Sequence, residues 1–228
     1  MYRPLEGGKN LNQKQSYPFI AIEGNIGAGK STLATMLSKD WNTRLILEEF
    51  EDNSFLPKFY KDARRYAFPL EMSFLAARFN QLKKQLPEQD LFKGSVISDY
   101  IITKCLLFSK VNLDEDEFEL YGKLFGIIQQ QLPKPDLLLY LHNPVEKLQQ
   151  HITQRGRSYE QEISNEYLLN LQQTYFDFLY NNKELKIILL DCTEIDFVNN
   201  SFHFEAIKKL LQQSFSLGLH TFTSKDLL

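Results

Sequence analysis

A glycine-rich segment near the start of the chain constrains its fold and chemistry more than any other feature. It reads Gly24-Asn25-Ile26-Gly27-Ala28-Gly29-Lys30-Ser31-Thr32 and matches the pattern G-x-x-x-x-G-K-S between an apolar run and a helical run. Glycines let successive backbone N–H groups face phosphate oxygens at a helix N-terminus, where Lys30 adds positive charge and the Ser31 hydroxyl can ligate Mg²⁺. We therefore expect the whole segment to bind a nucleoside triphosphate, with a chance glycine turn as the alternative.

Five short apolar runs predict a sheet. They are continuous rather than alternating, as in strands covered on both faces, and they occupy residues 19–22, 45–47, 96–98, 137–141 and 187–190. Longer stretches with helical spacing separate them, such as the one from Leu70 to Leu82. This alternation predicts an α/β fold with a five-stranded parallel sheet flanked by helices, whose ligands bind beyond the carboxyl ends of the strands.

Composition limits the class of protein. The chain has 228 residues, of which 43% are hydrophobic and 24% charged, as is typical of one globular domain with a sizeable core. With a net charge of -3, the chain lacks the excess of basic residues that binding to a phosphate backbone requires, so no nucleic acid partner is expected. We expect one domain at residues 17–217, a flexible N-terminal segment at 1–16 and a C-terminal tail at 218–228.

The sequence predicts a cytoplasmic protein. Cys105 and Cys192 form neither a disulfide framework nor a metal-ligand pattern, which fits a reducing compartment. The N-terminus lacks the apolar core of a signal peptide, and no run of about 18 apolar residues is present. We therefore expect no membrane partner.

Carboxylates follow the second and third predicted strands. Glu48 opens an acidic cluster at residues 48–53, where a carboxylate could orient an acceptor hydroxyl and take its proton; a solvated acidic loop is the alternative. Asp99 follows the third strand and could hold Mg²⁺ together with Ser31, or it could cap the helix expected to begin at Tyr100. The pair Arg155 and Arg157 flanks a glycine and suits a flap over a transferring phosphoryl group, although a basic helix end also explains it.

Six ordered stretches together resemble the deoxynucleoside kinase family of P-loop enzymes, most closely its bacterial deoxyguanosine kinase branch. They are FIAIEGNIGAGKSTLATML, EEFEDNSFLPKFY, FPLEMSFLAARFNQL, SDY followed by LLFSK, LPKPDLLLYL, and QRGRSYEQEI followed by EYLLNL, and they span the chain from about Pro18 to Leu211. The resemblance implies a P-loop kinase fold with an arginine-bearing lid at about residues 151–163. It also implies Mg²⁺-dependent transfer of the γ-phosphate of ATP, or of another nucleoside triphosphate, to the 5′-hydroxyl of a deoxynucleoside.

The resemblance implies roles for residues around the sugar and the phosphate. It makes Glu48 the general base for the 5′-hydroxyl, and it makes Tyr60 and Glu160 the pair that binds the 3′-hydroxyl. Arg155 and Arg157 match the lid arginines that contact the transferred group. From the residues alone, Tyr60 could instead pack with a solvated hydroxyl, and Glu160 could belong to an exposed acidic face.

The resemblance also implies where the two bases bind. Glu71 and Arg78 match the pair that reads the acceptor base, Phe74 and Phe108 are candidates to line its pocket, and Asp196-Phe197 resembles the loop that holds the donor base. By spacing alone, the two phenylalanines could be plain core, and Arg78 could lie over apolar neighbours at the surface.

Two departures from the wider family affect this interpretation. Many relatives carry Arg-Ser after the acidic residue that follows the third strand, whereas this chain has Tyr100-Ile101, with Lys104 shortly beyond as in the deoxyguanosine kinase branch. At position 71 many relatives have Gln, whereas this chain has Glu71. An ionised carboxylate accepts from the two adjacent donors of guanine and repels the acceptor nitrogen of adenine, so Glu71 favours guanine. Arg78 or Lys104 could complete that readout, and a Glu71 kept protonated by burial would instead admit adenine or cytosine.

We therefore expect a deoxyguanosine kinase that uses ATP or another nucleoside triphosphate and Mg²⁺. The alternatives are a deoxyadenosine or broader deoxynucleoside kinase, then a monophosphate kinase like thymidylate kinase, and then a nucleotide-binding regulator. The acidic acceptor loop disfavours a monophosphate acceptor, and the base-reading motifs of GTPase switches are not found in the sequence. The family implies a homodimer, for which a stripe from Tyr121 to Ile128 could serve, unless that stripe packs in the core.

Overall fold

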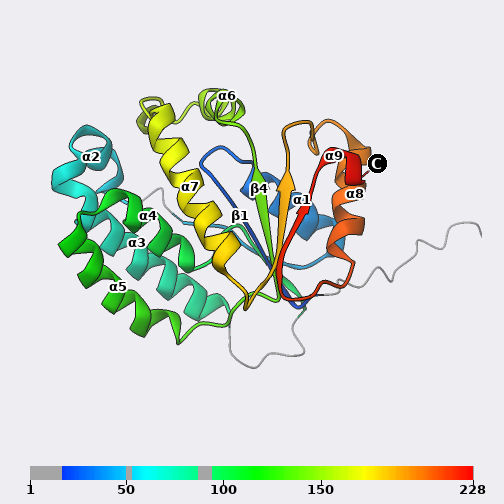
Figure 1. Cartoon of the computed structure of the whole chain (residues 1–228), viewed down its shortest axis with the longest axis horizontal. Coiled ribbons are helices and arrows are strands. Elements are labelled where there is room, and N and C mark those ends of the chain that lie inside the picture. Colours follow the sequence, from blue (N-terminus) through cyan, green and yellow to red (C-terminus); the bar gives the residue numbers. More distant parts are fainter. Residues whose placement is uncertain (1–16, 50–52, 87–93, 228) are drawn as a thin grey trace, which may run out of the picture.

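One parallel sheet organises the molecule, in the strand order β2-β3-β1-β4-β5-β6 (Figure 1). The computed structural model describes residues 17–49, 53–86 and 94–227, so the expected N-terminal segment 1–16 lies outside the described residues. The strands are β1 (Phe19–Gly24), β2 (Arg44–Ile46), β3 (Val96–Ser98), β4 (Leu137–His142), β5 (Lys186–Asp191) and β6 (Gly218–Phe222). The predicted parallel α/β sheet is confirmed.

The predicted number of five strands is wrong, because the described residues form six. The sixth strand, β6, lies within residues 218–228, which we expected to be a tail, and it pairs in parallel with β5. It is an edge strand whose residues are half-buried or exposed. An edge strand of this kind needs no continuous apolar run, so the pattern that identified the other five strands does not detect it.

Helices connect the strands and cover the sheet. They are α1 (Lys30–Trp41), α2 (Leu56–Lys61), α3 (Ala63–Gln85), α4 (Thr103–Asn112), α5 (Glu115–Gln129), α6 (Val145–Arg155), α7 (Asn165–Asn181), α8 (Ser201–Leu211) and α9 (Ser224–Leu227), with a 3₁₀ turn at Ser158–Glu160. None of the helices in the described part of the chain is both long and apolar enough to cross a bilayer.

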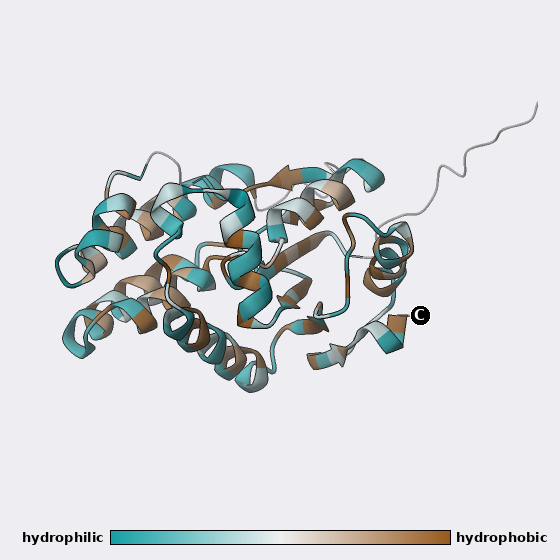
Figure 2. Cartoon of the chain, turned by 90° about the horizontal axis from the view of Figure 1, so that it is seen from above, coloured by the Kyte–Doolittle hydropathy of each residue, from teal (hydrophilic) through white to brown (hydrophobic). Residues whose placement is uncertain are grey.

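Two layers of helices enclose the sheet because alternate strand residues face opposite sides. In β1, Ile20 and Ile22 join a core cluster with residues of α1 and α8. Phe19 and Ala21 join a second cluster with residues of α3, α4 and α7. Figure 2 shows the resulting pattern, with hydrophobic sides of the helices turned toward the sheet.

A smaller group of helices extends from the second face. The helix α2 packs on α3 through Phe59, Leu70 and Phe74, and α5 packs on α3 and α4 through Tyr121 and Phe125. Tyr121 is therefore core, whereas Ile127 of the stripe proposed for a dimer contact is 64% exposed. Of these helices, α2 lies at the level of the carboxyl ends of the strands in Figure 1. The carboxyl ends of β1, β2 and β3 meet at the same edge because these strands are adjacent and parallel.

We predict that β6 stabilises the sheet although it occupies part of the expected tail. A chain that ends at Leu217 loses β6, exposes the edge of β5 and should unfold with a free energy lower by roughly 1 to 3 kcal/mol. A chain that ends at Thr223 keeps β6 and is the control, and urea unfolding monitored by circular dichroism measures both. Equal stability of the chain ending at Leu217 and the full chain would contradict a structural role for β6.

Candidate active site

The glycine-rich loop connects β1 to the N-terminus of α1, as the sequence predicts. Asn25 anchors it, since its side-chain Nδ2 donates to the carbonyl of Leu168 on α7 at 2.8 Å and its Oδ1 accepts from the N–H of Ile26 at 2.8 Å. The carbonyl of Gly27 lies 2.7 Å from Nδ1 of His151 on α6. The loop is thus fixed from two sides before any ligand binds.

Two glycines of this loop have positive φ angles that favour glycine. Gly27 has φ of 81°, and a Cβ there would lie 2.8 Å from the carbonyl oxygen of Leu148. Gly29 has φ of 88°, and a Cβ there would lie 3.1 Å from the ring of Phe197, a tight contact. Both positions therefore favour glycine for conformation, and Gly27 also leaves no room for a side chain.

Lys30 folds back over the loop. Its ammonium donates to the carbonyls of Gly24 at 3.0 Å and Asn25 at 2.9 Å. Burial, together with the positive charge of Lys104, lowers the pKa of Lys30 to about 8, although neighbouring carboxylates oppose the shift. A bound polyphosphate would favour the charged form, so Lys30 is suited to an anionic ligand.

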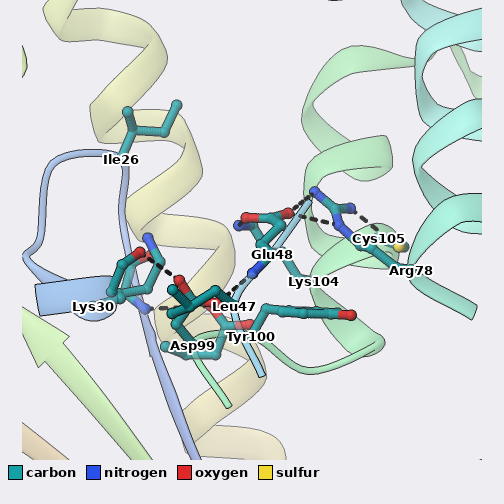
Figure 3. Close-up of polar contacts among 12 residues, drawn as sticks. Ile26, Lys30, Leu47, Glu48, Arg78, Asp99, Tyr100, Lys104 and Cys105 are labelled. Atoms are coloured by element: carbon teal, nitrogen blue, oxygen red, sulfur yellow. Dashed lines mark hydrogen bonds and ion pairs between the residues drawn. The ribbon is translucent and has the colours of Figure 1, made fainter. Parts of the chain in front are cut away.

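Asp99 joins the glycine-rich loop to the end of β2. Its Oδ1 accepts from the backbone N–H of Glu48 at 2.7 Å, and its Oδ2 accepts from the Ser31 hydroxyl. The following helix, α4, begins only at Thr103, so Asp99 does not cap it. The capping alternative is thereby excluded, and Asp99 lies between the phosphate loop and Glu48 (Figure 3).

Glu48 lies in a buried ion-pair network (Figure 3). Its Oε1 accepts from Arg78 Nη2 at 2.6 Å and from Nε at 2.7 Å, and its Oε2 is bound by Lys104. Burial raises the pKa of this carboxyl, but the ion pairs with Lys104 and Arg78 outweigh that effect and hold the pKa well below its ordinary value. Glu48 is therefore ionised at neutral pH. In contrast, Glu49 binds Gln81, and residues 50–52 of the acidic cluster lie outside the described residues.

Tyr100 supports Glu48 indirectly, at the position where many relatives carry arginine. It is fully buried, and its hydroxyl donates to Oε1 of Gln81 at 2.5 Å. Gln81 Nε2 donates in turn to the carbonyl of Leu47 at 2.7 Å, directly before Glu48. The tyrosine thus braces the end of β2 and does not supply a charge.

A cavity lies beyond Glu48, between α2, α3, α4 and α7. It is lined by Ile26, Lys30, Ser31, Glu48, Leu56, Phe59, Tyr60, Leu70, Glu71, Phe74, Arg78, Lys104, Phe108, Asn112, Arg155, Arg157, Glu160 and Tyr167. All the residues that the resemblance assigns to the acceptor line it, whereas Asp99 does not. Its volume of about 110 Å³ is below the range of about 300 to 1,000 Å³ usual for small-molecule pockets.

The residues expected to read the acceptor base occupy one side of this cavity. Arg78 is 3% exposed and its guanidinium lies 4.4 Å from the centre of the Phe74 ring, so it is not a surface residue. Its Nη1 also donates to the buried Cys105 thiol at 3.1 Å. Phe74 and Phe108 line the cavity and also pack in the core clusters, so the two interpretations of these rings are compatible.

Glu71 is the most deeply buried acid of this cavity, with 1% of the residue exposed. Its Oε1 accepts from Nδ2 of Asn112 at 2.6 Å, whereas its Oε2 is buried without a hydrogen-bond partner. Burial raises the pKa of Glu71 to about 7, and Arg78, the Asn112 hydrogen bond and Lys104 limit the rise. Both protonation states of Glu71 are therefore accessible near neutral pH.

The segment expected to form a lid covers the opposite side of the cavity. Gly156 ends α6 with φ of 71° and separates Arg155 from Arg157. Glu160 binds both arginines, at 3.3 Å from Arg157, and lines the cavity together with Tyr60. The ring of Tyr60 stacks on Tyr159 with centroids 6.1 Å apart, which ties the segment to α2.

A larger cleft of about 800 Å³ lies on the other side of the glycine-rich loop, between Gly27–Thr32, α6 and residues 192–199. Asp196 and Phe197 line it, as expected. The Asp196 carboxylate accepts from the N–H groups of Val198 at 3.0 Å and Asn199 at 2.9 Å, so it shapes its own loop. Lys147, which the sequence analysis did not identify, holds this loop through the carbonyls of Thr193 and Ile195 at 3.2 and 3.1 Å.

Asn112 and Tyr167 also line the first cavity but were missed by the sequence analysis. Lys104, Phe108 and Asn112 follow one another at intervals of four residues along α4, so helical spacing from the first two residues points to the third. Tyr167 lies in the stretch EYLLNL, which carries part of the family resemblance.

Ser31 and Asp99 fit a magnesium ion that accompanies a nucleotide. Their hydroxyl and carboxylate oxygens meet beside the phosphate loop, and both are hard oxygen ligands of the kind that Mg²⁺ prefers. The described residues contain no cluster of three or more acidic, histidine or cysteine side chains that could hold a metal unaided. Phosphate oxygens and waters would complete the coordination, as is usual for Mg²⁺.

We predict that Tyr100→Phe destabilises the protein, because it leaves the buried Oε1 of Gln81 without its donor. The free energy of unfolding should fall by about 1 to 3 kcal/mol. The matched control is Tyr180→Phe, since Tyr180 is 65% exposed. Urea unfolding at equal protein concentration measures both variants, and an equal, small effect of the two substitutions would contradict the bracing role of Tyr100.

Comparisons with known proteins agree with this geometry. A family model described as "Deoxynucleoside kinase" matches residues 20–216. The chain is 40% identical over 195 residues to a deoxyguanosine kinase of Bacillus subtilis (strain 168), covering 83% of this chain and 94% of that protein. It is 35% identical over 178 residues to a deoxyadenosine kinase of Dictyostelium discoideum, covering 77% and 72% of the two chains.

A solved structure supports the same assignment. The structure of deoxyadenosine kinase from M. mycoides with bound dCTP superposes with a TM-score of 0.73 at 28% identity, covering 85% of this chain and 98% of that chain. With the phosphate loop, the buried glutamate and the two cavities in place, the chain belongs to the deoxynucleoside kinase family and is a nucleoside kinase.

Proposed function

We propose that this kinase transfers the γ-phosphate of ATP to the 5′-hydroxyl of a purine deoxynucleoside, with deoxyguanosine as the preferred acceptor. The observation that carries the choice of guanine is Glu71, which lies buried in the acceptor cavity with Oε2 unpartnered. Guanine offers N1–H and an amino group as donors to such an oxygen, whereas adenine presents an acceptor nitrogen there. The relative with 40% identity is named a deoxyguanosine kinase.

Glu48 is the proposed general base. It lies next to the phosphate loop, it is ionised at neutral pH, and its backbone is fixed by Asp99. A carboxylate in this place can accept the 5′-hydroxyl proton as the oxygen attacks the γ-phosphorus. Its ion pairs with Arg78 and Lys104 keep the carboxylate in place.

Cations around the phosphate loop would neutralise the transferring group. Lys30, Arg155 and Arg157 line both cavities and lie between them. Guanidinium groups bind phosphate oxygens in a planar fork. The two arginines would therefore replace their ion pairs with Glu160 by contacts with the phosphoryl group. Mg²⁺ held by Ser31 and Asp99 would supply charge neutralisation on the phosphates when it is bound.

Tyr60 and Glu160 are the proposed partners of the 3′-hydroxyl. Both line the acceptor cavity, and the carboxylate of Glu160 raises the pKa of Tyr60 in addition to the effect of burial. The phenol therefore stays protonated and can act as a donor. A monophosphate acceptor is disfavoured, because Arg78 and Lys104, at the far side of this cavity, are already paired with Glu48.

Deoxyadenosine is the second candidate acceptor, favoured by one observation. The pKa of Glu71 near 7 makes a protonated side chain accessible, and this form donates a hydrogen bond as glutamine does. Two relatives, from Dictyostelium discoideum and Lactobacillus acidophilus, are named deoxyadenosine kinases.

We also propose a cytoplasmic homodimer. The two described cysteines are unpaired and buried, as suits a reducing compartment. Exposed apolar side chains, Leu169 at 52% and Tyr180 at 65%, lie on α7 and could be covered by a second copy of the chain.

The test of the reaction is release of ADP from ATP and Mg²⁺ with deoxyguanosine, deoxyadenosine, deoxycytidine or thymidine as acceptor. Deoxyguanosine should give the highest kcat/KM, and Glu48→Gln should lower kcat by about 10² to 10⁴-fold because the base is lost. Glu166→Gln, an exposed acid on α7, is the control. Binding of ATP without acceptor-dependent release of ADP would instead indicate a nucleotide-binding regulator.

A further inference from the structure

Asn112 is a wall residue of the acceptor cavity with a specific polar contact. It ends α4, and its Nδ2 donates to Oε1 of Glu71 at 2.6 Å. Tyr167 of α7 lines the same cavity as Asn112. The carboxyl group of Glu71 cannot rotate without breaking its short hydrogen bond from Asn112.

The contact makes the two oxygens of Glu71 unequal. Oε1 is occupied by Asn112, and Oε2 is buried without a partner. A buried polar atom without a hydrogen bond is costly, so Oε2 is left for a ligand. Recognition of guanine by both carboxylate oxygens of Glu71, as expected from the sequence, would require the base to displace Asn112 from Oε1.

We propose that Asn112 is a positioning residue that determines base specificity. By holding Oε1 of Glu71, Asn112 leaves only Oε2 to contact the acceptor base. An ionised Oε2 accepts a hydrogen bond from guanine, whereas a protonated Oε2 donates one to adenine. This inference rests on the proposed function, since it concerns the acceptor of that same reaction. The hydrogen bond from Asn112 favours the ionised form, because an amide N–H stabilises a carboxylate. Asn112 thus biases the site toward guanine.

Charged and titratable groups from five helices and from the segment after β2 surround Glu71 and set its proton affinity. They are Arg78 on α3, Lys104 and Cys105 on α4, Tyr121 on α5, Tyr60 on α2, Tyr167 on α7 and Glu48 after β2. The balance of burial and these charges places the pKa of Glu71 at about 7. Guanine preference should consequently rise as the pH increases through about 7, where Glu71 loses its proton.

The experiment compares kcat/KM for deoxyguanosine and deoxyadenosine from about pH 5.5 to about pH 9 in the wild type, Asn112→Ala and Glu71→Gln. The ratio of kcat/KM for deoxyguanosine to kcat/KM for deoxyadenosine should increase with pH in the wild type and should not change with pH in Glu71→Gln. In Asn112→Ala, loss of the amide hydrogen bond should raise the midpoint of this increase and lower the guanine-to-adenine ratio at pH 7 by at least about fivefold. Asn170→Ala, an exposed asparagine on α7, is the matched control.

A second measurement does not depend on turnover. The carboxyl carbon of Glu71, followed by ¹³C NMR without substrate, should titrate near pH 7 in the wild type and at higher pH in Asn112→Ala. Asn112→Gln, which can still donate, should restore part of the wild-type midpoint.

Two results would overturn the inference while leaving the kinase intact. One is a pH-independent ratio in the wild type, and the other is an Asn112→Ala variant that lowers both kcat/KM values equally, as a purely structural role predicts. A protein that phosphorylates neither deoxynucleoside at any pH would instead overturn the proposed function, and this inference with it.

Discussion

The rest of the site depends on the two hydrogen bonds that Asp99 accepts, because they connect the phosphate loop to Glu48. One oxygen holds the Ser31 hydroxyl of the phosphate loop and the other holds the backbone of Glu48. Three strands that are distant in sequence thus meet at a single carboxylate. This arrangement is possible because β2, β3 and β1 are adjacent and parallel, which brings their carboxyl ends to the same edge of the sheet.

The ion pairs around Glu48 suit its proposed role as general base better than a role in stability. Burial of charged groups is costly, and the attraction between them repays that cost only with good geometry. Here Glu48 is matched by two cations, and Tyr100 and Gln81 brace the backbone before it. The benefit of such a network is a carboxylate that is already charged and oriented when the substrate arrives.

Much of this molecule could be predicted from sequence, because local patterns specify its strands and its phosphate loop. The G-x-x-x-x-G-K-S segment and the continuous apolar runs are local signals, and the family resemblance is confirmed by the match over residues 20–216. The edge strand β6 was not predicted, because a half-exposed strand needs no continuous apolar run. The contact between Glu71 and Asn112 was not predicted, because it joins residues 41 positions apart on two helices. The spacing of residues within either helix does not indicate such a pair.

The pairing of β1 has a consequence for how the protein is made. Ile20, at the centre of the sheet, pairs with Ile97 on one side and with Leu137 on the other. During synthesis, the strand that precedes the phosphate loop therefore has no neighbour until β3 has been made, and it lacks its second neighbour until β4 has been made. Non-local strand pairing is slow, and an unpaired apolar strand is prone to aggregate. The most recognisable motif in this sequence is thus synthesised before either of the two strands that flank it in the sheet.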